Sequence, residues 1–464
     1  MRIKDEIKRI GYFWLPNKPE RKIPGTLSVA KSGDIDLELA GILEEGSDFI
    51  RIDIKIDRII GHVEKDGDIT LDNCFYREKN ISPGGISKSL ICANKLFSGV
   101  AFKQGQDVLI NSMRFSIEGI DDWIGISGIN VENDFEKRTS IITYNPPKEI
   151  IIELRDNIQL IITYSYNLPG LPSNKEAKIS QKLFFKLVSK EERKLKEFMS
   201  IAYKITTFLC FAIGEMVCIE SMRVTNDNLC RTESDGNKYE IPYNVYFAST
   251  HYSTTAPKID IHRLLFKYSQ IKDSFERVIN NWINAYDKFE QSFYLYFSTK
   301  MGDHKYVEGK FLALAQGLEA YHRRISTEKL MDEEQYSILV SSIIDNCPDK
   351  HKEWITGRLM HGNEISFRNR IKRIIEPFKD LIGTAKERNK LISLIVDTRN
   401  YFTHLDKALA SRAASGEKLW ILYNKIELIF QLQFMNILGF NTESINQLVK
   451  SNYQMTQKLK ESMI

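Results

Sequence analysis

Cysteine is scarce in this sequence, with six residues among 464, and no two of them form a Cys-x-x-Cys pair. The cysteines are not combined with histidines in the paired spacing of a zinc module. Disulfide scaffolds and structural zinc sites both need such clusters, so we predict neither. Scattered thiols of this kind fit a reducing compartment, and we therefore expect a cytoplasmic protein.

Long apolar runs are also missing. The most apolar helical stretch, residues 205–219, follows Lys204 and is interrupted by Glu215, whereas a membrane-spanning helix needs about 20 apolar residues. The first residues, from Met1 to Trp14, lack the apolar core and cleavage site of a secretory signal. We therefore predict neither a membrane span nor export.

Neither sign of charge is in large excess, because 65 Lys and Arg face 61 Asp and Glu, for a net charge of +4. A surface coated with basic charge is excluded, and any nucleic-acid-binding surface must be local. The composition is 42% hydrophobic and 27% charged, which is typical of folded proteins rather than disordered ones. The length predicts two or three domains.

The first part of the chain shows the periodicity of β-strands. Ile50, Ile52, Ile54 and Ile56 alternate with charged residues, and the runs 150–166 and 179–187 are rich in β-branched and aromatic residues. We predict an antiparallel, β-rich domain over residues 1–188. The pattern does not decide between a sandwich and a barrel.

Helical patterns follow. Ser189 and Glu192 have the spacing of a capping box, which predicts that a helix begins there. Residues 189–300 read as a helical connecting region with a short irregular or strand insert, and residues 301–464 as all-α. The expected fold class is thus α+β. We expect helices at 261–299, 304–326, 332–346, 366–381, 385–411, 416–438 and 443–461.

The most informative segment is residues 391–405, read as one amphipathic helix. Its apolar stripe comprises Leu391, Ile395, Phe402, Leu405 and Leu409, and its opposite side carries Asp397, Asn400 and His404. The long stem of Arg399 can bring its guanidinium to the side of His404. An imidazole moves protons near neutral pH and a guanidinium binds phosphate, so these residue types suit phosphodiester chemistry on RNA without a metal.

The pattern Arg399-Asn400-x-x-x-His404 resembles the Arg-polar-x-His signature of the HEPN superfamily. The segments 11–16, 25–27 and 33–39 resemble the β-rich N-terminal region of ApeA-like HEPN proteins. This resemblance implies that the C-terminal part is a HEPN helical bundle. It also implies catalytic roles for Arg399, Asn400 and His404, with no cofactor and no metal. Because the chain holds one copy of the signature, the resemblance implies a homodimer with a composite active site.

The function implied is a metal-independent endoribonuclease of anti-phage abortive infection. It would cleave RNA, with transfer RNA as one candidate, to 2′,3′-cyclic phosphate and 5′-OH ends. The N-terminal domain would act as a sensor that restrains cleavage until it binds a phage-derived trigger. The alternative is a dimeric HEPN scaffold without catalysis, in which the β domain recognises a partner.

Two further groups of residues are candidates. Asp397 and Glu319 are candidates for residues that support the signature residues from behind. Glu319 also lies three residues before His322, which is the spacing of metal ligands in di-metal helical bundles. Such a bundle needs a second pair of this kind, and the sequence has none. A basic segment is either a track for RNA phosphates or an ordinary solvated helix face. Its cationic residues are Arg368, Arg370, Lys372, Arg373, Lys386 and Arg388.

Overall fold

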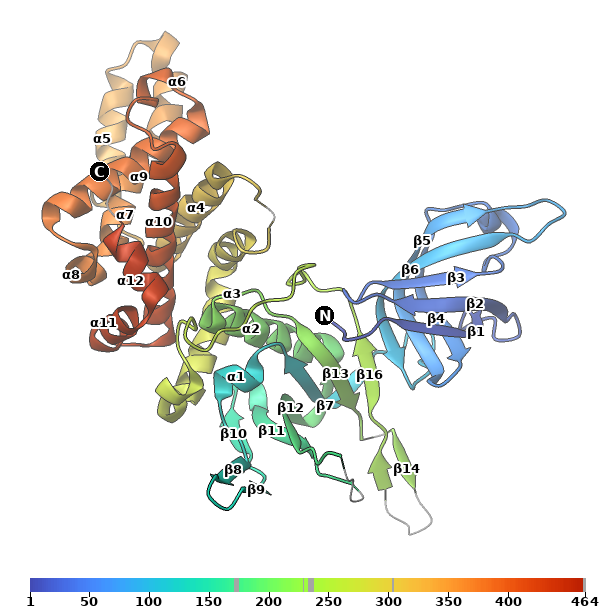
Figure 1. Ribbon diagram of the computed structural model, residues 1–464. Coiled ribbons are helices and arrows are strands. Elements are labelled where there is room, and N and C mark those ends of the chain that lie inside the picture. Colours follow the sequence, from blue (N-terminus) through green and yellow to red (C-terminus); the bar gives the residue numbers. More distant parts are fainter. Residues whose placement is uncertain (171–174, 228, 233–237, 303, 462–464) are drawn as a thin grey trace. The chain divides into compact units, whose positions relative to one another are not determined.

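The computed structural model describes residues 1–170, 175–227, 229–232, 238–302 and 304–461. The chain forms two compact units, Met1–Asn280 and Asn281–Ile464. The first is rich in antiparallel strands and the second is helical (Figure 1). The predicted α+β fold class is therefore confirmed. None of the helices in the described residues is both long and apolar enough to cross a membrane.

Six antiparallel strands of the first unit close into a barrel, which settles the choice between sandwich and barrel for this part. Gly11 lies opposite Gly25 on one neighbouring strand. A Cβ on Gly11 would lie 2.3 Å from the carbonyl oxygen of His62 on the other neighbouring strand, so the close approach of that strand requires glycine at position 11. Phe13 and Leu71 fill the interior. The strands are β1 (Ile7–Trp14), β2 (Ile23–Val29), β3 (Ile35–Leu39), β4 (Lys55–Val63), β5 (Gly67–Asn80) and β6 (Lys88–Ser98), in the order β6, β3, β2, β1, β4, β5, with β5 pairing again with β6.

A second set of antiparallel strands continues from β6. In spatial order it comprises β16 (Tyr243–Tyr246), β13 (Ile219–Thr225), β7 (Leu109–Ile117), β12 (Ser180–Lys194), β11 (Ile158–Asn167) and β10 (Ile150–Glu153). Helix α2 (Leu195–Ile213) packs against β12 and β7. The side chains of Met113, Phe115 and Phe185 are buried. The smaller elements of this unit are α1 (Ile120–Ile124), the hairpin of β8 (Ile129–Asp134) and β9 (Thr139–Tyr144), the hairpin of β14 (Cys230–Thr232) and β15 (Lys238–Glu240), and short 3-10 turns at Gly46–Phe49, Arg155–Asn157, Tyr268–Gln270 and Lys272–Ser274.

Two local predictions in this unit were wrong. Ser189 does not cap a helix: it is buried in β12 opposite Ile158, and α2 begins six residues later at Leu195. Pairing with a distant strand outweighs the local capping pattern. The alternating isoleucines are only partly a strand, since β4 begins at Lys55 and Ile50 is 75% exposed. The register of β4 is set by its neighbours, where Lys55 lies opposite Phe75 of β5.

The second unit is built around α10 (Gly416–Leu438), most of whose residues are buried. Phe434 of α10 lies 4.6 Å from Phe293 and 5.6 Å from Trp282 of α3 (Phe275–Ser298), measured between ring centroids. This aromatic cluster forms the core that fixes α10 in the bundle. The remaining helices are α4 (Val307–Ile325), α5 (Glu333–Asp345), α6 (Asp349–Leu359), α7 (Phe367–Ile375), α8 (Lys379–Ile382), α9 (Ala385–His404), α11 (Thr442–Ser451) and α12 (Tyr453–Lys460), with 3-10 turns at Glu376–Phe378 and Lys407–Leu409.

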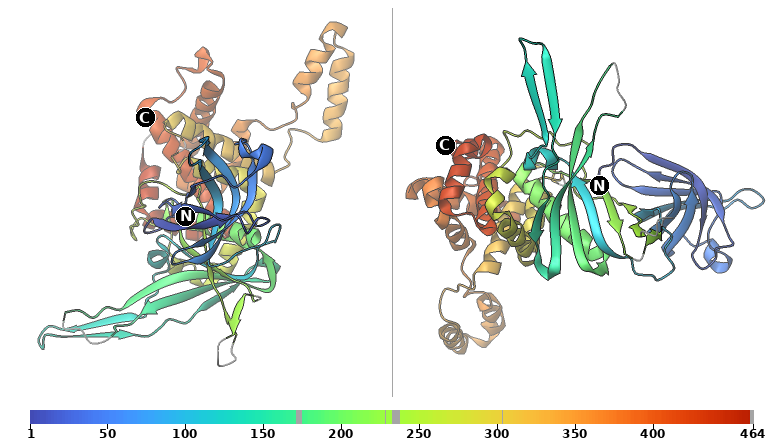
Figure 2. Two further views of the ribbon diagram at one scale, coloured as in Figure 1. Left: turned by 90° about the vertical axis from the view of Figure 1, so that its right-hand side faces the viewer. Right: turned by 90° about the horizontal axis from the view of Figure 1, so that it is seen from below.

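Helices α5 and α6 form a hairpin in which no residue is buried. Figure 2 shows the pair side by side, standing away from the other helices of its unit. Helix α6 was not predicted from the sequence, because its apolar residues are too few and too scattered to form a stripe: Trp354 and Ile355 are followed by Thr356, Gly357 and Arg358.

The other expected helices differ from the structure mainly at their ends. The helix predicted at 416–438 is confirmed as α10, but the one predicted at 385–411 ends at His404 because Leu405 adopts a left-handed conformation with φ 51°. The helix predicted at 443–461 is divided at Asn452, whose side chain accepts a hydrogen bond from the N–H of Met455 at 2.9 Å. The stretch 366–381 is interrupted near Pro377, and the stretch 261–299 becomes an α-helix only from Phe275.

Candidate active site

Helix α9 carries the residues of the signature. Its N-terminus is a capping box, in which Glu387 accepts the N–H of Thr384 at 2.7 Å and the Thr384 hydroxyl accepts the N–H of Glu387 at 3.3 Å. Leu391 and Ile395 are buried, and so is Thr398, whose hydroxyl accepts the N–H of Ala414 at 2.9 Å. These contacts fix the helix and the chain that follows it.

The polar trio does not share one environment. Asp397 and Asn400 are half-buried, whereas His404 is exposed at the last residue of α9. The prediction that Leu405 continues the apolar stripe was wrong: its left-handed backbone ends the helix, and its side chain is 69% exposed. His404 and Leu405 therefore form an exposed end of the signature helix.

Arg399 is held by three neighbours. Its Nη2 donates to Glu319 Oε2 of α4 at 3.2 Å, and its Nη1 donates to Asn400 Oδ1 at 3.1 Å. The guanidinium also lies over the ring of Phe367, 5.2 Å from the centroid. Its side chain remains 30% exposed. The guanidinium is thus oriented but still accessible.

A pocket of about 560 Å³ opens beside this guanidinium. Its lining comprises Leu312, Gln316, Glu319, Ala320, Arg323, Arg399 and Thr403. His404 follows Thr403 directly in the chain, and none of the hydrogen bonds and ion pairs seen among the described residues involves its imidazole. An anion in the pocket would meet Arg399 and Arg323 together, with Glu319 between them.

Sequence reasoning missed a network that continues from Glu319. Glu319 Oε1 accepts from Arg323 Nη2 at 3.1 Å, and Arg323 also pairs with Glu364. Hydrogen bonding by Arg323 holds the pKa of the Glu364 carboxyl below its ordinary value. The contact between Glu319 and Arg323 could have been predicted, because residues four apart on a helix are neighbours. The contact of Arg323 with Glu364 could not have been predicted, because Glu364 is distant in the sequence.

The network ends in the interior at Arg370 and His322. Arg370 Nη2 lies 3.4 Å from Glu364 Oε2, and its Nη1 lies 3.3 Å from His322 Nδ1. Burial lowers the pKa of His322, and the Arg370 cation lowers it further, so both favour the neutral imidazole. His322 therefore serves as an acceptor for Arg370. His322 is not among the residues that line the pocket.

The candidate basic track is not a single exposed face. Arg370 is 4% exposed, and Arg373 is paired with Glu328 at 2.6 Å. Arg368 donates to the Ser393 hydroxyl at 3.0 Å, and Arg388 donates to backbone carbonyls of Lys379 and Gly383. Lys372 and Lys386 are exposed. Asp397 Oδ2 lies 4.0 Å from Arg412 Nε, and no ion pair between Asp397 and Arg399 is seen among the described residues.

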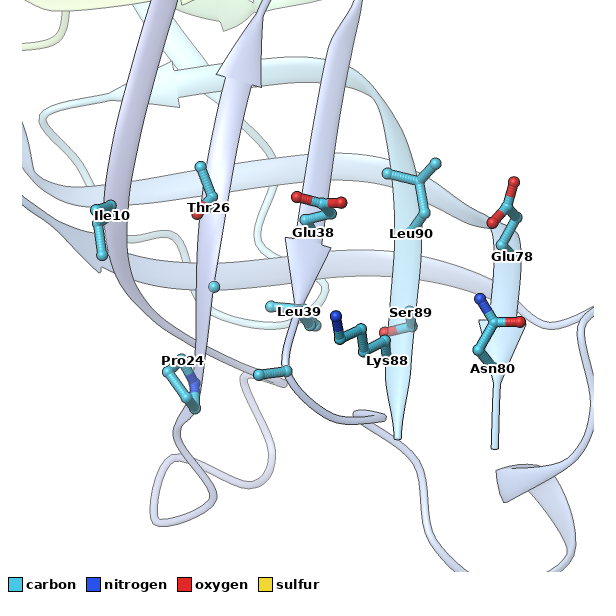
Figure 3. A pocket seen from close by; sticks show the side chains of 12 residues that line it. Ile10, Pro24, Thr26, Glu38, Leu39, Glu78, Asn80, Lys88, Ser89 and Leu90 are labelled. Carbon is cyan, nitrogen blue, oxygen red and sulfur yellow. The ribbon is translucent and has the colours of Figure 1, made fainter. Parts of the chain in front are cut away.

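A second hollow, of about 390 Å³, lies on the outer wall of the barrel. Figure 3 shows Ile10, Thr26, Glu38 and Leu90 on neighbouring strands around it, with Lys88 and Glu78 nearby. Its lining contains no histidine or arginine. It therefore lacks the pair of groups that phosphodiester cleavage uses.

Comparison with known families identifies both units. A family model described as ApeA N-terminal domain 1 matches residues 8–282, more than half of the chain. A second, described as Apea-like HEPN, matches residues 312–444, which include Glu319, Arg399 and His404. No match was found among curated proteins or among solved structures. The chain therefore belongs to the ApeA-like HEPN family of anti-phage proteins.

Proposed function

We propose that this protein is an endoribonuclease that acts in anti-phage defence through Arg399, Asn400 and His404. The observation that carries the proposal is the accessible guanidinium of Arg399 at the pocket of about 560 Å³, with the exposed His404 five residues further along the same helix. RNA cleavage requires binding of the phosphate, which Arg399 can provide, and proton transfer, which His404 can provide.

In the proposed reaction, His404 removes the proton from a ribose 2′-OH. The 2′ oxygen then attacks the adjacent phosphorus, so that a 2′-O–P bond forms and the P–O5′ bond breaks. The products are a 2′,3′-cyclic phosphate and a 5′-OH, whose oxygen takes a proton from a second imidazole. Arg399 stabilises the charge that develops on the phosphate oxygens, and Asn400 orients Arg399 through the bond of 3.1 Å.

The second imidazole comes, in this proposal, from a second copy of the chain. Each chain has one signature, and His404 and Leu405 are exposed at the end of α9, where another copy can approach them. The active site is therefore a composite of two protomers, and RNA, with transfer RNA as one candidate, lies between them. The exposure of His404 supports this geometry, because a buried imidazole could not reach RNA that lies between two protomers.

The unit Met1–Asn280 is proposed to be the sensor. The two family models divide the chain, and the signature lies wholly within the second. A phage-derived trigger that binds the first unit would release cleavage by the second. The isolated second unit, residues 281–464, should accordingly be more toxic to cells than the whole chain.

Cleavage of mixed RNA in EDTA tests the catalytic proposal. The second unit, residues 281–464, lacks the proposed sensor and should therefore cleave without a trigger and leave 2′,3′-cyclic phosphate ends, while His404→Ala and Arg399→Ala in this unit should each lose activity by at least about 100-fold. His351→Ala, at an exposed histidine of α6, is the matched control and should cleave normally. Equal cleavage by the unsubstituted protein and His404→Ala would overturn the role of His404, and absence of cleavage by both would leave the scaffold alternative. Loss of cleavage in EDTA would overturn the metal-independent mechanism.

A further inference from the structure

Three cations lie side by side in one row on the sheet of the first unit. Lys186 of β12 is opposite Arg114 of β7, and Arg114 is opposite Arg223 of β13. Neighbouring strands are about 4.8 Å apart, so the row places three positive charges within about 10 Å. Figure 1 shows these strands adjacent to one another.

The row occupies the open face of the sheet. Side chains alternate along a strand, and the neighbours Met113 and Phe115 are buried on the opposite face, the one covered by α2. Lys186 and Arg114 are half-buried and Arg223 is exposed. The charges are thus accessible from solvent.

The chain itself does little to neutralise this row. No ion pair between these three cations and a carboxylate is seen in the described residues, and the Nε of Arg114 is buried without a hydrogen-bond partner. Burial lowers the pKa of Arg114, Arg223 lowers it further, and the nearby Glu149 offsets only part of this effect. Like charges directly opposite across strands destabilise a sheet. Such a row carries an energetic cost that a bound anion would reduce.

An aromatic ring completes the surface. Phe184 is two residues before Lys186 on the same face of β12, and the Arg114 guanidinium lies 3.9 Å from its ring centroid. Lys182 lies 5.7 Å from the same centroid and pairs with Glu220 at 2.8 Å. A ligand that carries only carboxylates would be bound by the three positive charges alone. A nucleobase also uses flat surfaces, because bases stack on aromatic rings and on arginine planes.

We propose that the face formed by Lys186, Arg114, Arg223 and Phe184 binds a single-stranded nucleic acid. Phosphates lie along the row of cations, and a base stacks on the Phe184 and Arg114 pair. The bases of a duplex are already stacked on one another, so a duplex can use the charges but not the ring. The site is distinct from the pocket at Arg399 and requires no cleavage.

Binding of fluorescein-labelled (dT)20 to the full-length protein, measured by fluorescence anisotropy, tests this proposal. DNA lacks the 2′-OH needed for the proposed reaction, so the result is independent of nuclease activity. The double variant Arg114→Gln/Arg223→Gln should weaken binding by more than tenfold and make its salt dependence shallower, because two phosphate contacts are lost. Phe184→Leu should weaken binding by about fivefold or more, since stacking is lost while the charges remain. Lys8→Gln/Lys55→Gln, at exposed barrel residues, is the matched control and should bind as wild type.

Competition experiments identify the class of ligand. Unlabelled (dT)20 should displace the probe at much lower concentration than a 20-base-pair duplex or polyglutamate. Stronger competition by polyglutamate would overturn the proposal in favour of an acidic protein, and stronger competition by the duplex would also overturn it. Unchanged binding by Arg114→Gln/Arg223→Gln, with a wild-type melting temperature, would show that the face is not the site. Should that variant unfold, Phe184→Leu and Lys186→Gln would decide by the same assay.

Discussion

Arg399 and Glu319 are joined across α9 and α4 by an ion pair of 3.2 Å at the edge of a pocket. The second oxygen of the same carboxylate accepts from Arg323 at 3.1 Å. Glu319 therefore holds two guanidinium groups apart and in place. A phosphate that enters the pocket meets an oriented Arg399 but also a neighbouring negative charge, so Glu319 both positions the cation and opposes the anion.

Glu319→Gln should tighten RNA binding. Glutamine keeps an oxygen acceptor for Arg399 but removes the charge that repels phosphate. Because a partly exposed ion pair is worth about 0.5–1 kcal/mol, we expect KM for RNA cleavage to fall by about threefold, with kcat nearly unchanged. Steady-state kinetics would check this, with Glu308→Gln in the first turn of α4 as the control. A rise in KM would show that the carboxylate helps to bind substrate.

Leu405→Gly should stabilise the helical unit. Leu405 has a φ of 51° and is 69% exposed, so glycine relieves backbone strain with little loss of the surface that is buried within one protomer. We expect a gain of about 1 kcal/mol in the free energy of unfolding, measured by urea denaturation. Ala408→Gly, in the 3-10 turn that follows, lacks a left-handed φ and should be neutral or destabilising. Equal effects of the two substitutions would contradict the argument.

The sequence predicted those parts of the fold whose signals are local. Helix α10 was predicted with its observed bounds because a continuous apolar pattern ends at Gly439, which adopts a left-handed φ of 89° as the helix C-cap. Ser189 failed because its capping pattern competes with the pairing to Ile158, which lies 31 residues earlier. The closure of β5 onto β6 could not be read either, since alternation shows which side chains point inward but not which strands meet.

The same distinction holds at the candidate site. The sequence placed Arg399, Asn400 and His404 on one helix, and it indicated Glu319 as a partner if its helix packs beside Arg399, which it does. It did not indicate Arg323, Glu364 or the burial of Arg370. Those contacts join segments that are distant in the chain, and a run of basic residues does not reveal which of its members turn inward.

Glu427→Gln should strongly destabilise the helical unit. Glu427 of α10 has a side chain that is 3% exposed, and it pairs with Lys300 and with Lys458 of α12, the latter at 2.7 Å. Despite its burial, these two lysines hold the pKa of the carboxyl at about 2. Glutamine would leave both ammonium groups without their counter-charge, at a cost of about 3 kcal/mol.

Urea denaturation of the Glu427→Gln variant checks this prediction. Glu417→Gln, at an exposed residue in the first turn of the same helix, is the matched control and should change stability by less than about 0.5 kcal/mol. Similar losses for both variants would mean that the buried pairs do not stabilise the bundle.

His251 should make the first unit sensitive to acid. Its ring is 2% exposed and lies 4.8 Å from the ring of Tyr203, and burial lowers its pKa from 6.5 to about 4. As the pH falls from 6.5 to 4, the unfolded chain binds a proton that the folded chain does not, so stability falls over this range and is fully present above it. At about 1.4 kcal/mol for each pH unit, the loss is on the order of 3 kcal/mol.

In His251→Phe this contribution is absent, so the difference in unfolding free energy between wild type and variant should shrink or change sign between pH 7.5 and pH 4. His262→Phe, at an exposed histidine, should show no such trend. A constant difference between wild type and His251→Phe across this range would show that the ring titrates normally and that burial does not keep it neutral.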